Sequence, residues 1–318
     1  KIKAMWMAAV AAVGLIAASG AASAEGYPEK EITVVVNYGA GGGTDLSTRS
    51  LANAAETVLG VPMKVVNRAG GSGTVGPTFV AFSDPDGYTV GVTSFSPLAI
   101  TPHVQKVPYT VENFRFLAGF ARFLTGIAVP ADSEYQSIDD LVAAAKEGKR
   151  ITYGAASTIE TVAMVRLGNA AGVKFQWIRY GSGQEVSTAA LSKTVDVIVA
   201  DPKDLVPFAK TGEMRILASA SNVRLPGAED IPTLKEQGYD VAVESYAGIG
   251  APAGITDEQA AVLEAAFAEA FKAQAFQDTL EKLGMQPVYF TGEEYRGLIA
   301  EGYEAMGRDL EEIGLKAN

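Results

Sequence analysis

The chain has 318 residues, with 26 basic and 37 acidic side chains, a formal net charge of −11 at pH 7 and no cysteine. The acidic balance argues against nucleic acid and anionic lipid as partners, because phosphate groups are bound by clustered Lys and Arg. The lack of cysteine excludes disulfides, thiolate catalysis, Cys-ligated zinc and a lipid-modified N-terminal cysteine. An anionic ligand would have to be held by local backbone dipoles, not by the overall field.

The first 24 residues have the features of a secretory leader. Lys1 and Lys3 precede an apolar run that extends from Met5 to Ala18, and small residues fill positions 22–24. The run is too short to span about 30 Å of hydrocarbon, which argues against a retained membrane anchor. We therefore expect cleavage after Ala24 and a periplasmic mature protein of one large or two medium domains.

Strand and helix signals alternate along the rest of the chain. A Val-rich run at residues 31–38 predicts a strand buried on both faces, and a helix is expected from near Thr44 to Gly60. Capping-box patterns predict further helix starts at Ser137, Thr256 and Thr291. The other predicted strands are 63–67, 88–94, 151–154, 175–180, 195–200 and 215–220. This alternation favours an α/β fold with largely parallel sheets.

Two apolar stretches, residues 116–129 and 243–252, are interpreted as crossings between two lobes. They divide the chain into a first lobe of residues 25–122 plus 248–318 and a second lobe of residues 123–247. The first lobe would then combine the N-terminal third with the C-terminal helices.

A glycine-rich loop joins the first strand to the first helix. Glycines allow several backbone N–H groups to point into one concavity, and a helix N-terminus adds unpaired donors and a partial positive charge. Such a loop can bind an anion without a basic side chain, although a strand-to-helix turn without a ligand is the alternative. The candidate ligand-binding residues are Tyr38, Gly39, Ala40, Gly41, Gly42, Gly43, Thr44 and Asp45.

A second glycine cluster at residues 67–76 contains the pattern Gly71-x-Gly73-x-x-Gly76. This pattern occurs in dinucleotide-binding proteins, but here it does not follow the first strand. No acidic residue lies about 20 positions beyond it, where the ribose partner is expected. We interpret the cluster as a structural turn.

Few residues suggest catalysis. His103 is the only histidine, no Gly-x-Ser-x-Gly elbow is present, and we expect this histidine in a solvated loop. With one histidine and no cysteine, no transition metal or other cofactor is predicted. A pair of carboxylates of the glycosidase type stays open, since nothing singles out two of them.

Four further residues each allow two interpretations. Arg122 and Arg179 near strand ends could bind a second carboxylate of a ligand, but surface ion pairs are favoured. Trp177 is expected in the core together with Phe175, rather than in a stacking platform. Tyr246 fits hinge packing and a pocket wall equally well.

Taken together, the order of segments resembles the Bug (TctC-like) family of extracytoplasmic receptors of tripartite tricarboxylate transporters. The resemblance covers nearly all of the chain after the leader. The segments that carry it are Tyr27-Pro28, Gly41-Gly42-Gly43-Thr44-Asp45, Asn67-Arg68, Pro85-Asp86-Gly87-Tyr88, Tyr180-Gly181-Ser182, Val195-Asp196, Ile231-Pro232-Thr233 and Ala251-Pro252-Ala253-Gly254.

The resemblance implies a two-lobed periplasmic-binding-protein (Venus-flytrap, type II-like) fold that encloses a ligand. It also implies a carboxylate held by loop backbone and bridging waters near residues 39–45. Three departures concern the pocket: Asn37 replaces a usual proline, residues 153–157 are short and poor in glycine, and Thr161 stands near a missing histidine. Further binding residues implied by the family are Ser94, Phe95, Ser96, Ala156, Ser157, Thr158, Thr161, Tyr180 and Asp201.

We therefore expect a non-enzymatic receptor that closes around a small carboxylate, which could be a di- or tricarboxylate, an amino acid or an aromatic acid. The expected partners are that ligand and the membrane subunits of a tripartite tricarboxylate transporter, with a monomeric receptor and no nucleic acid. One alternative is a periplasmic sensor that feeds a two-component kinase. A more remote one is an exported α/β hydrolase, whose nucleophile–histidine pair is missing.

Overall fold

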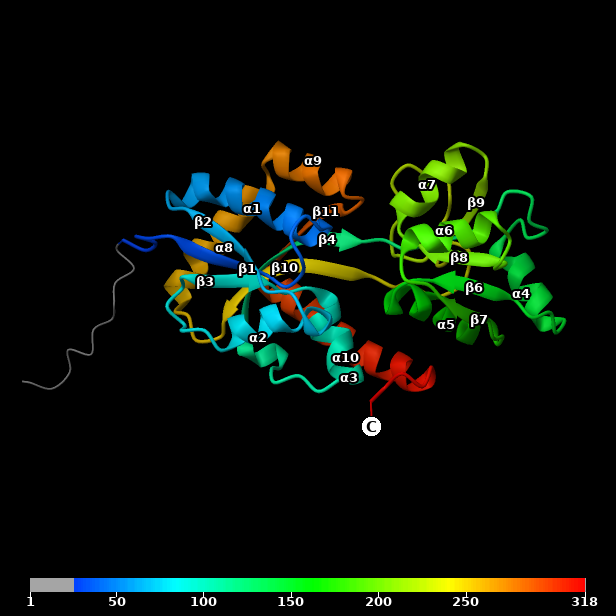
Figure 1. Cartoon of the computed structure of the whole chain (residues 1–318), viewed down its shortest axis with the longest axis horizontal. Helices are drawn as coiled ribbons and strands as arrows, with labels where there is room; N and C mark the ends of the chain where they lie inside the picture. The colour runs from blue at the N-terminus through cyan, green and yellow to red at the C-terminus, as the bar shows by residue number, and fades with distance from the viewer. Residues whose placement is uncertain (1–25, 318) are drawn as a thin grey trace, which may run out of the picture.

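The computed structural model of the protein describes residues 26–317. The predicted leader, with cleavage after Ala24, lies outside these residues. The described strands form two sheets, and Figure 1 shows the corresponding two lobes side by side along the long axis of the molecule. Within residues 26–317 no helix is both long and apolar enough to cross a membrane.

The first sheet has six strands in the order β11-β4-β10-β3-β1-β2. Strand β1 pairs in parallel with β2 and β3, and β10 pairs antiparallel with both β3 and β4. Helices α1, α8 and α9 cover one face, while α2 and α10 lie on the other (Figure 1). The strands are β1 Ile32–Val36, β2 Met63–Asn67, β3 Thr89–Val92, β4 Phe114–Phe123, β10 Ser245–Pro252 and β11 Gln286–Thr291.

The helices of this lobe are α1 Gly43–Leu59, α2 Val75–Ala81, α3 Thr101–Val104, α8 Asp257–Phe271, α9 Gln274–Lys282 and α10 Gly292–Glu312. Short helical turns cover Gly71–Gly73, Ser96–Ile100 and Val111–Asn113. Helix α1 buries Leu51, Ala52 and Ala55, which share one face of the helix. It ends as predicted at Gly60, whose φ of 71° is the left-handed conformation that favours glycine.

The second sheet has five strands in the order β7-β6-β8-β5-β9. Helix α5 packs on one face, and α6 and α7 pack on the other. The strands are β5 Gly126–Pro130, β6 Thr152–Ala155, β7 Gln176–Arg179, β8 Val197–Ala200 and β9 Met214–Ser219. The helices are α4 Ile138–Lys146, α5 Thr158–Ala171, α6 Gly183–Leu191 and α7 Pro202–Lys210.

Local sequence patterns predicted the positions of the strands and of several helix starts correctly. Each predicted strand exists with both ends within two residues of the predicted bounds, and the three predicted capping boxes begin α4, α8 and α10. In each box the Ser or Thr side chain accepts from the third helical N–H, while that residue's side chain accepts from the cap N–H. The helix starts are therefore fixed by the sequence itself.

The prediction of largely parallel sheets is wrong. Only β1–β3 and β6–β8 follow the parallel strand–helix–strand pattern. Strands β4 and β10 lead out of and back into the first lobe, so they run in opposite directions and pair antiparallel. Strand β5 pairs antiparallel with β8 and β9, and β11 with β4. Both sheets are therefore mixed.

The chain passes between the sheets next to Thr125 and again at Glu244, and the two passages are bonded to each other. Ser221 Oγ accepts from Thr125 N–H at 3.1 Å and donates to Val243 O at 3.2 Å. Arg122 Nε lies 3.6 Å from Glu244 Oε1. The predicted lobe boundaries fall inside β4 and β10, a few residues from these passages.

A third connection joins the lobes through α10, which reaches α5 of the second lobe (Figure 1). Arg166 of α5 donates to Asp309 Oδ2 from Nε at 3.1 Å and from Nη2 at 2.7 Å. Asn169 Nδ2 donates to Glu312 Oε2 at 2.7 Å. Met306 and Leu310 of α10 belong to the same apolar cluster as the buried side of α5. The lobes are thus held together along one side.

Candidate functional site

The strand order of the first sheet reverses at β1. From β1 the chain passes through α1 to β2 on one side, and from β2 it passes through α2 to β3 on the other side. Loops that leave β1 and β3 therefore diverge at their carboxyl ends, where α/β proteins bind ligands. These loops contain the predicted site residues 38–43 and 94–96, which the fold brings to one edge of the sheet.

The second sheet repeats this arrangement. Strand β6 lies between β7 and β8, and α5 and α6 make the two crossovers. The loop after β6 carries Ala156 and Ser157, and Asp201 follows β8 directly. The strand order reverses at β6. Tyr180 follows β7, the edge strand next to β6. We call the two carboxyl ends the lobe-1 edge and the lobe-2 edge.

The two edges are turned toward each other. Strand β5 enters the second sheet at Gly126, which pairs with Ala200 at the carboxyl end of β8. Strand β10 enters the first sheet at Ser245 and meets Val92 at the carboxyl end of β3 through Ile249. Both parallel strand sets therefore end on the side of the interlobe passages. One close approach is Gly284, where an added Cβ would lie 3.2 Å from Cβ of Lys203 on α7.

The glycine-rich loop leaves the start of α1 without a side-chain cap. Gly42 is the N-cap residue, and no side chain bonds to the first helical N–H groups. Gly41 has a φ of 80°, a conformation that L residues with a side chain rarely adopt. Gly39, Ala40, Gly41 and Gly42 are exposed. The loop thus presents backbone donors and the positive end of α1 to solvent.

Asp45, in the first turn of α1, holds this loop through hydrogen bonds. Its Oδ2 accepts from the Gly41 N–H at 2.9 Å and from Arg49 Nε at 3.0 Å, and its Oδ1 accepts from Asn67 Nδ2 at 2.8 Å. Burial would raise the pKa of this 2% exposed carboxyl, but these hydrogen bonds and the Arg49 charge lower the pKa on balance. Asp45 is therefore a buried anion that fixes the loop.

Two asparagines that the sequence analysis did not assign complete the support of the loop. Asn67 Nδ2 also donates to Tyr38 O at 3.0 Å, and its Oδ1 accepts from Arg49 Nη2 at 3.0 Å. Asn37 Nδ2 donates to Gly73 O at 3.3 Å and to Ser94 Oγ at 3.4 Å. Asn37 thus links the loop after β1 to the loop after β3, at the position where the resemblance leads one to expect proline.

The second glycine cluster is a structural turn beside the first. Gly70, Gly71 and Gly73 all have positive φ, and Gly71–Gly73 form a short helical turn. A Cβ on Gly73 would lie 3.0 Å from the Tyr38 ring, and one on Gly76 would lie 2.8 Å from the Cα of Asn37. These glycines let α2 approach the first loop closely, which agrees with the structural interpretation.

The remaining predicted residues of the lobe-1 edge differ in exposure. Thr44 is half-buried in α1, and its carbonyl accepts from Thr48 Oγ1 at 2.6 Å. Ser96 begins the helical turn Ser96–Ile100. Phe95 is only 3% exposed, and its ring centroid lies 6.1 Å from that of Tyr246 in an edge-to-face contact. Phe95 therefore packs in the core in this structure.

The lobe-2 edge has a different helix start. Ser157 caps α5 and accepts from the Glu160 N–H at 3.4 Å. Glu160 Oε2 in turn accepts from the Ala156 N–H at 2.7 Å and the Ser157 N–H at 2.9 Å. Burial raises the pKa of Glu160 to about 7, against the effect of these hydrogen bonds. Thr158 is the first residue of α5, and Thr161 Oγ1 is bonded to Ser157 O at 3.1 Å.

Glu160 was not predicted as a site residue, although the signal was present. Ser157-x-x-Glu160 is a capping-box pattern of the same kind as the three that were recognised. Asp201 and Asp204 begin α7 close by, and burial raises the pKa of both carboxyls. Asp201 Oδ2 lies 3.5 Å from Lys203 Nζ. The lobe-2 edge is therefore rich in carboxylates.

Tyr180 packs across the end of the second sheet. An added Cβ on Gly154 would lie 3.1 Å from Cε2 of Tyr180, so Gly154 makes room for this ring. The Tyr180 N–H donates to Ala155 O at 3.2 Å. Trp177 and Phe175 are partly buried against the core, as predicted, and Trp177 Nε1 donates to Ala155 O at 3.3 Å.

Two predictions about charged or polar side chains are corrected. Arg122 was favoured as a surface ion pair, but its pair with Glu244 lies at the interlobe passage with 16% and 9% of the two side chains exposed. His103 was expected in a solvated loop. It lies in α3, its Nε2 is 2.8 Å from Tyr303 O, and its ring centroid is 4.1 Å from that of Tyr303. Packing against α10 explains this position.

Tyr246 and Arg179 have clear surroundings. The Tyr246 ring packs edge-to-face against Phe290 with 5.5 Å between centroids, and its hydroxyl donates to Glu244. Tyr246 is thus part of the packing at the passages. Arg179 is exposed, with its guanidinium carbon 5.8 Å from the centroid of the Trp177 ring.

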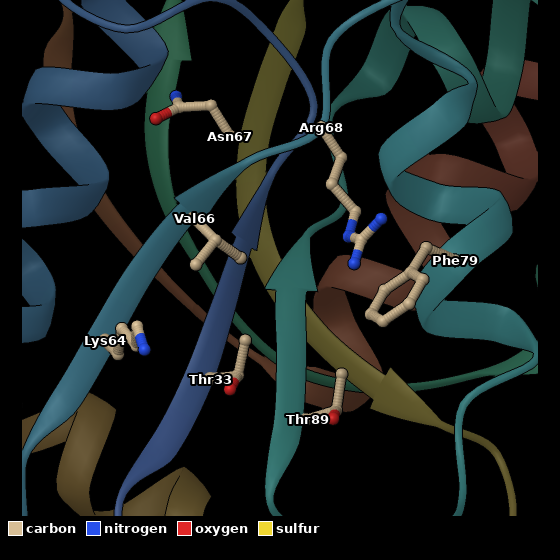
Figure 2. Close-up of a pocket in the computed structure, with 7 residues that line it drawn as sticks. All are labelled: Thr33, Lys64, Val66, Asn67, Arg68, Phe79 and Thr89. Atoms are coloured by element: carbon tan, nitrogen blue, oxygen red, sulfur yellow. The ribbon is translucent and has the colours of Figure 1, made fainter.

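Two cavities lie outside the facing edges. One of about 340 Å³ lies on the first sheet beside α2, where Figure 2 shows Arg68 pointing toward the Phe79 ring above Thr33 and Thr89. Another of about 210 Å³ lies between α5 and the end of α10. In residues 26–317 no three His, Cys, Asp or Glu side chains are grouped so as to hold a metal ion.

Two mixed sheets joined by paired passages, with the candidate site loops at facing edges, are the architecture of two-lobed solute-binding proteins. Residues 47–315 match the model of the TctC family, described as the tripartite tricarboxylate transporter family receptor. The chain belongs to this family. Its members are solute-binding proteins, which are periplasmic and generally not enzymes.

Individual relatives and a solved structure agree with this family and its fold. A UPF0065 protein from Cupriavidus necator is 31% identical, over 97% of this chain and 95% of its own. The protein BugT of Bordetella pertussis is 28% identical, over 96% of this chain and 98% of its own. A crystal structure of a TctC solute-binding protein from Polaromonas superposes with a TM-score of 0.83 at 27% identity, covering 90% of this chain and 99% of that one. The two-lobed α/β fold expected from the resemblance is thereby confirmed.

Proposed function

We propose that this protein captures a small organic carboxylate between its two lobes in the periplasm and delivers it to the membrane subunits of a tripartite tricarboxylate transporter. The observation that carries the proposal is the lobe-1 edge, where exposed glycines and an uncapped helix start present backbone donors at a switch in strand order. The Asp45–Arg49–Asn67 network holds these donors in place before a ligand arrives.

In this proposal the carboxylate binds to the loop backbone of residues 39–44, and the lobe-2 edge closes over the rest of the ligand. The residues that would line the second half are Ser157, Thr158, Tyr180 and Asp201. Closure would bend the chain at the paired passages while the ligand contacts both lobes, since only contacts to both lobes favour the closed state. The receptor would act as a monomer.

A thermal-shift screen of the purified protein against organic acids tests binding. A ligand at a hundred times its Kd adds about 2.7 kcal/mol to the free energy of unfolding, which shifts the melting transition measurably. We expect one class of acids to raise the melting temperature selectively. The protein should also be denatured and its supernatant analysed by mass spectrometry, because a co-purified ligand would mask the shift. No shift together with no co-purified acid would contradict the proposal.

Delivery to a transporter needs a separate test. Uptake of the acid found in the screen should be measured in cells that lack this receptor and in cells complemented with it. We expect uptake to require the receptor. Unchanged uptake with a receptor-dependent change in transcription would instead support the sensor alternative.

A further inference from the structure

Glu160 fills the position at the lobe-2 edge where a helix start would otherwise bind an anion. It is the third residue of α5, it is 6% exposed, and its Oε2 accepts the N–H groups of Ala156 and Ser157 at 2.7 and 2.9 Å. These N–H groups directly precede the first turn of α5, at the positive end of the helix. The protein's own carboxylate therefore occupies this anion position.

The surroundings of Glu160 do not compensate its charge with a cation. In the described part of the chain it forms no ion pair, and Asp201 of α7 adds a further negative charge, which supports a raised pKa. Lys203, the nearest cation to Asp201, is paired with that residue at 3.5 Å. The adjacent start of α6 is filled in the same way, because Glu185 Oε2 accepts from the Gly181 N–H at 2.8 Å.

We propose that Glu160 determines ligand specificity. It excludes a second ligand carboxylate from the lobe-2 edge and accepts a hydrogen bond from the far end of the ligand. The ligand is then a monocarboxylate whose far end carries a hydrogen-bond donor such as an amide, hydroxyl or amino group. This inference rests on the proposed function, since it assigns the ligand's own carboxylate to the lobe-1 edge.

The physical argument concerns donors and charge. A second carboxylate would find the Ala156 and Ser157 donors already used and would lie beside the carboxylates of Glu160 and Asp201, which is a repulsive arrangement. A donor group would pair with Glu160 instead of leaving its carboxylate desolvated and incompletely bonded. The same side chain thus supplies both the attraction to one ligand class and the repulsion of another.

The experiment compares matched pairs, each a dicarboxylate and its monoamide: succinate with succinamate, glutarate with glutaramate, and terephthalate with its monoamide. The two members of a pair have nearly the same shape, so their affinity ratio reports the far end alone. Titration calorimetry at pH 8 measures the ratio for the pair that binds best. We expect the wild-type protein to bind the monoamide at least tenfold more tightly.

Two variants assign the preference to Glu160. In Glu160→Gln the ratio should fall at least fivefold, because the amide keeps the side chain's shape but removes its charge and can donate to a carboxylate. Asp140→Asn is the matched control. Asp140 has the same capping-box position in α4, with Oδ2 accepting from Gln136 N–H at 2.8 Å and Ser137 N–H at 3.0 Å, away from the lobe-2 edge. Its ratio should equal that of the wild type.

A wild-type ratio near one, or one that favours the dicarboxylate, would overturn the inference and leave the proposed function intact. An unchanged ratio in Glu160→Gln would also overturn it. The wild-type ratio decides the question alone if that variant does not fold. Failure of every acid to bind, with none co-purified, would overturn the proposed function and this inference with it.

Discussion

Asp45 and Glu160 occupy equivalent positions in the two lobes and behave in opposite ways. Each is the third residue of the helix that follows a strand at a switch in strand order, and each accepts backbone N–H groups from the loop before its helix. Asp45 also meets Arg49 and Asn67, so its pKa is lowered, whereas Glu160 forms no ion pair within residues 26–317 and burial raises its pKa to about 7.

The difference shows what a buried carboxylate does at a helix start. With a cation beside it, Asp45 accepts only one loop N–H and leaves the other donors of α1 free for a ligand. Glu160 forms no ion pair within residues 26–317, and it accepts the two N–H groups that directly precede α5 while Ser157 caps the helix. Similar local folds therefore produce one edge suited to an anion and one that opposes it.

The largest effect is expected for Asp45→Ala. This change leaves Arg49, Asn67 and the Gly41 N–H without their shared acceptor. Removing one partner of a buried ion pair costs roughly 3–5 kcal/mol, and we expect about 3 kcal/mol because Arg49 is partly exposed. Urea denaturation measures the loss, with Asp140→Ala in the exposed box of α4 as the control. A loss no greater than that of the control would show that the loop does not depend on Asp45.

A bulky residue at Gly42 should abolish binding and spare the fold. Gly42 has a φ of −76° and an added Cβ would lie no closer than 3.5 Å to Gly39 O, so Gly42→Phe fits without backbone strain. Its ring would cover the donors at the start of α1. We expect the affinity for the acid found in the screen to fall about 100-fold, or about 2.7 kcal/mol.

Calorimetry tests the expected loss of affinity in Gly42→Phe, and thermal denaturation tests whether its fold is intact. Gly297→Phe on the exposed side of α10 is the control, because nothing lies within 4 Å of an added Cβ there. Unchanged affinity in Gly42→Phe would remove the glycine-rich loop from the binding site.

Glu160 should make stability depend on pH. Its pKa is about 7 in the folded protein against an ordinary value of 4.5, so between these values the folded state binds the extra proton. Its contribution to the free energy of unfolding is therefore fully present below pH 4.5 and is lost as the pH rises through 7. We expect a loss of about 2 kcal/mol, which is less than the full shift implies because the site relaxes on ionisation.

Urea denaturation of wild type and Glu160→Gln at several pH values isolates this effect. Groups with a lowered pKa, such as Asp45, give the opposite slope and cancel in the difference between the two proteins. A difference that does not change with pH would mean that Glu160 titrates normally.

The smallest effect concerns the contact that keeps the two edges opposite each other. Arg166 and Asp309 join α5 to α10, with 26% and 14% of the side chains exposed. A double-mutant cycle with Arg166→Ala and Asp309→Ala should give a coupling energy of about 1 kcal/mol in urea denaturation. Zero coupling would mean that this ion pair does not help to hold the lobes together on this side.

Sequence patterns gave the local structure and the lobe-1 edge because both depend on neighbouring residues. Helical spacing, capping boxes and glycines are read within one element, and they located α1, its loop and the starts of α4, α8 and α10. The fold brings the predicted site residues to two facing edges, and their contact with a ligand stays a prediction.

Non-local partners were not predictable in the same way. The antiparallel place of β10 between β3 and β4, the pair of Arg122 with Glu244 and the contact of His103 with Tyr303 all join distant segments. Hydrophobic periodicity does not encode which strands pair. Glu160 differs from these. Its capping-box pattern is visible in the sequence, but its proposed role depends on which charged groups lie near it, and only the fold shows those.

Strand β10 also sets the order in which the molecule can be completed as it is synthesised or exported. The five strands of the second sheet are complete at Ser219, whereas the first sheet cannot close until residues 245–252 insert between β3 and β4. Folding of a chain that emerges from its N-terminus therefore completes the second lobe first. The nascent protein therefore completes the half that carries Glu160 before the half that carries the glycine-rich loop.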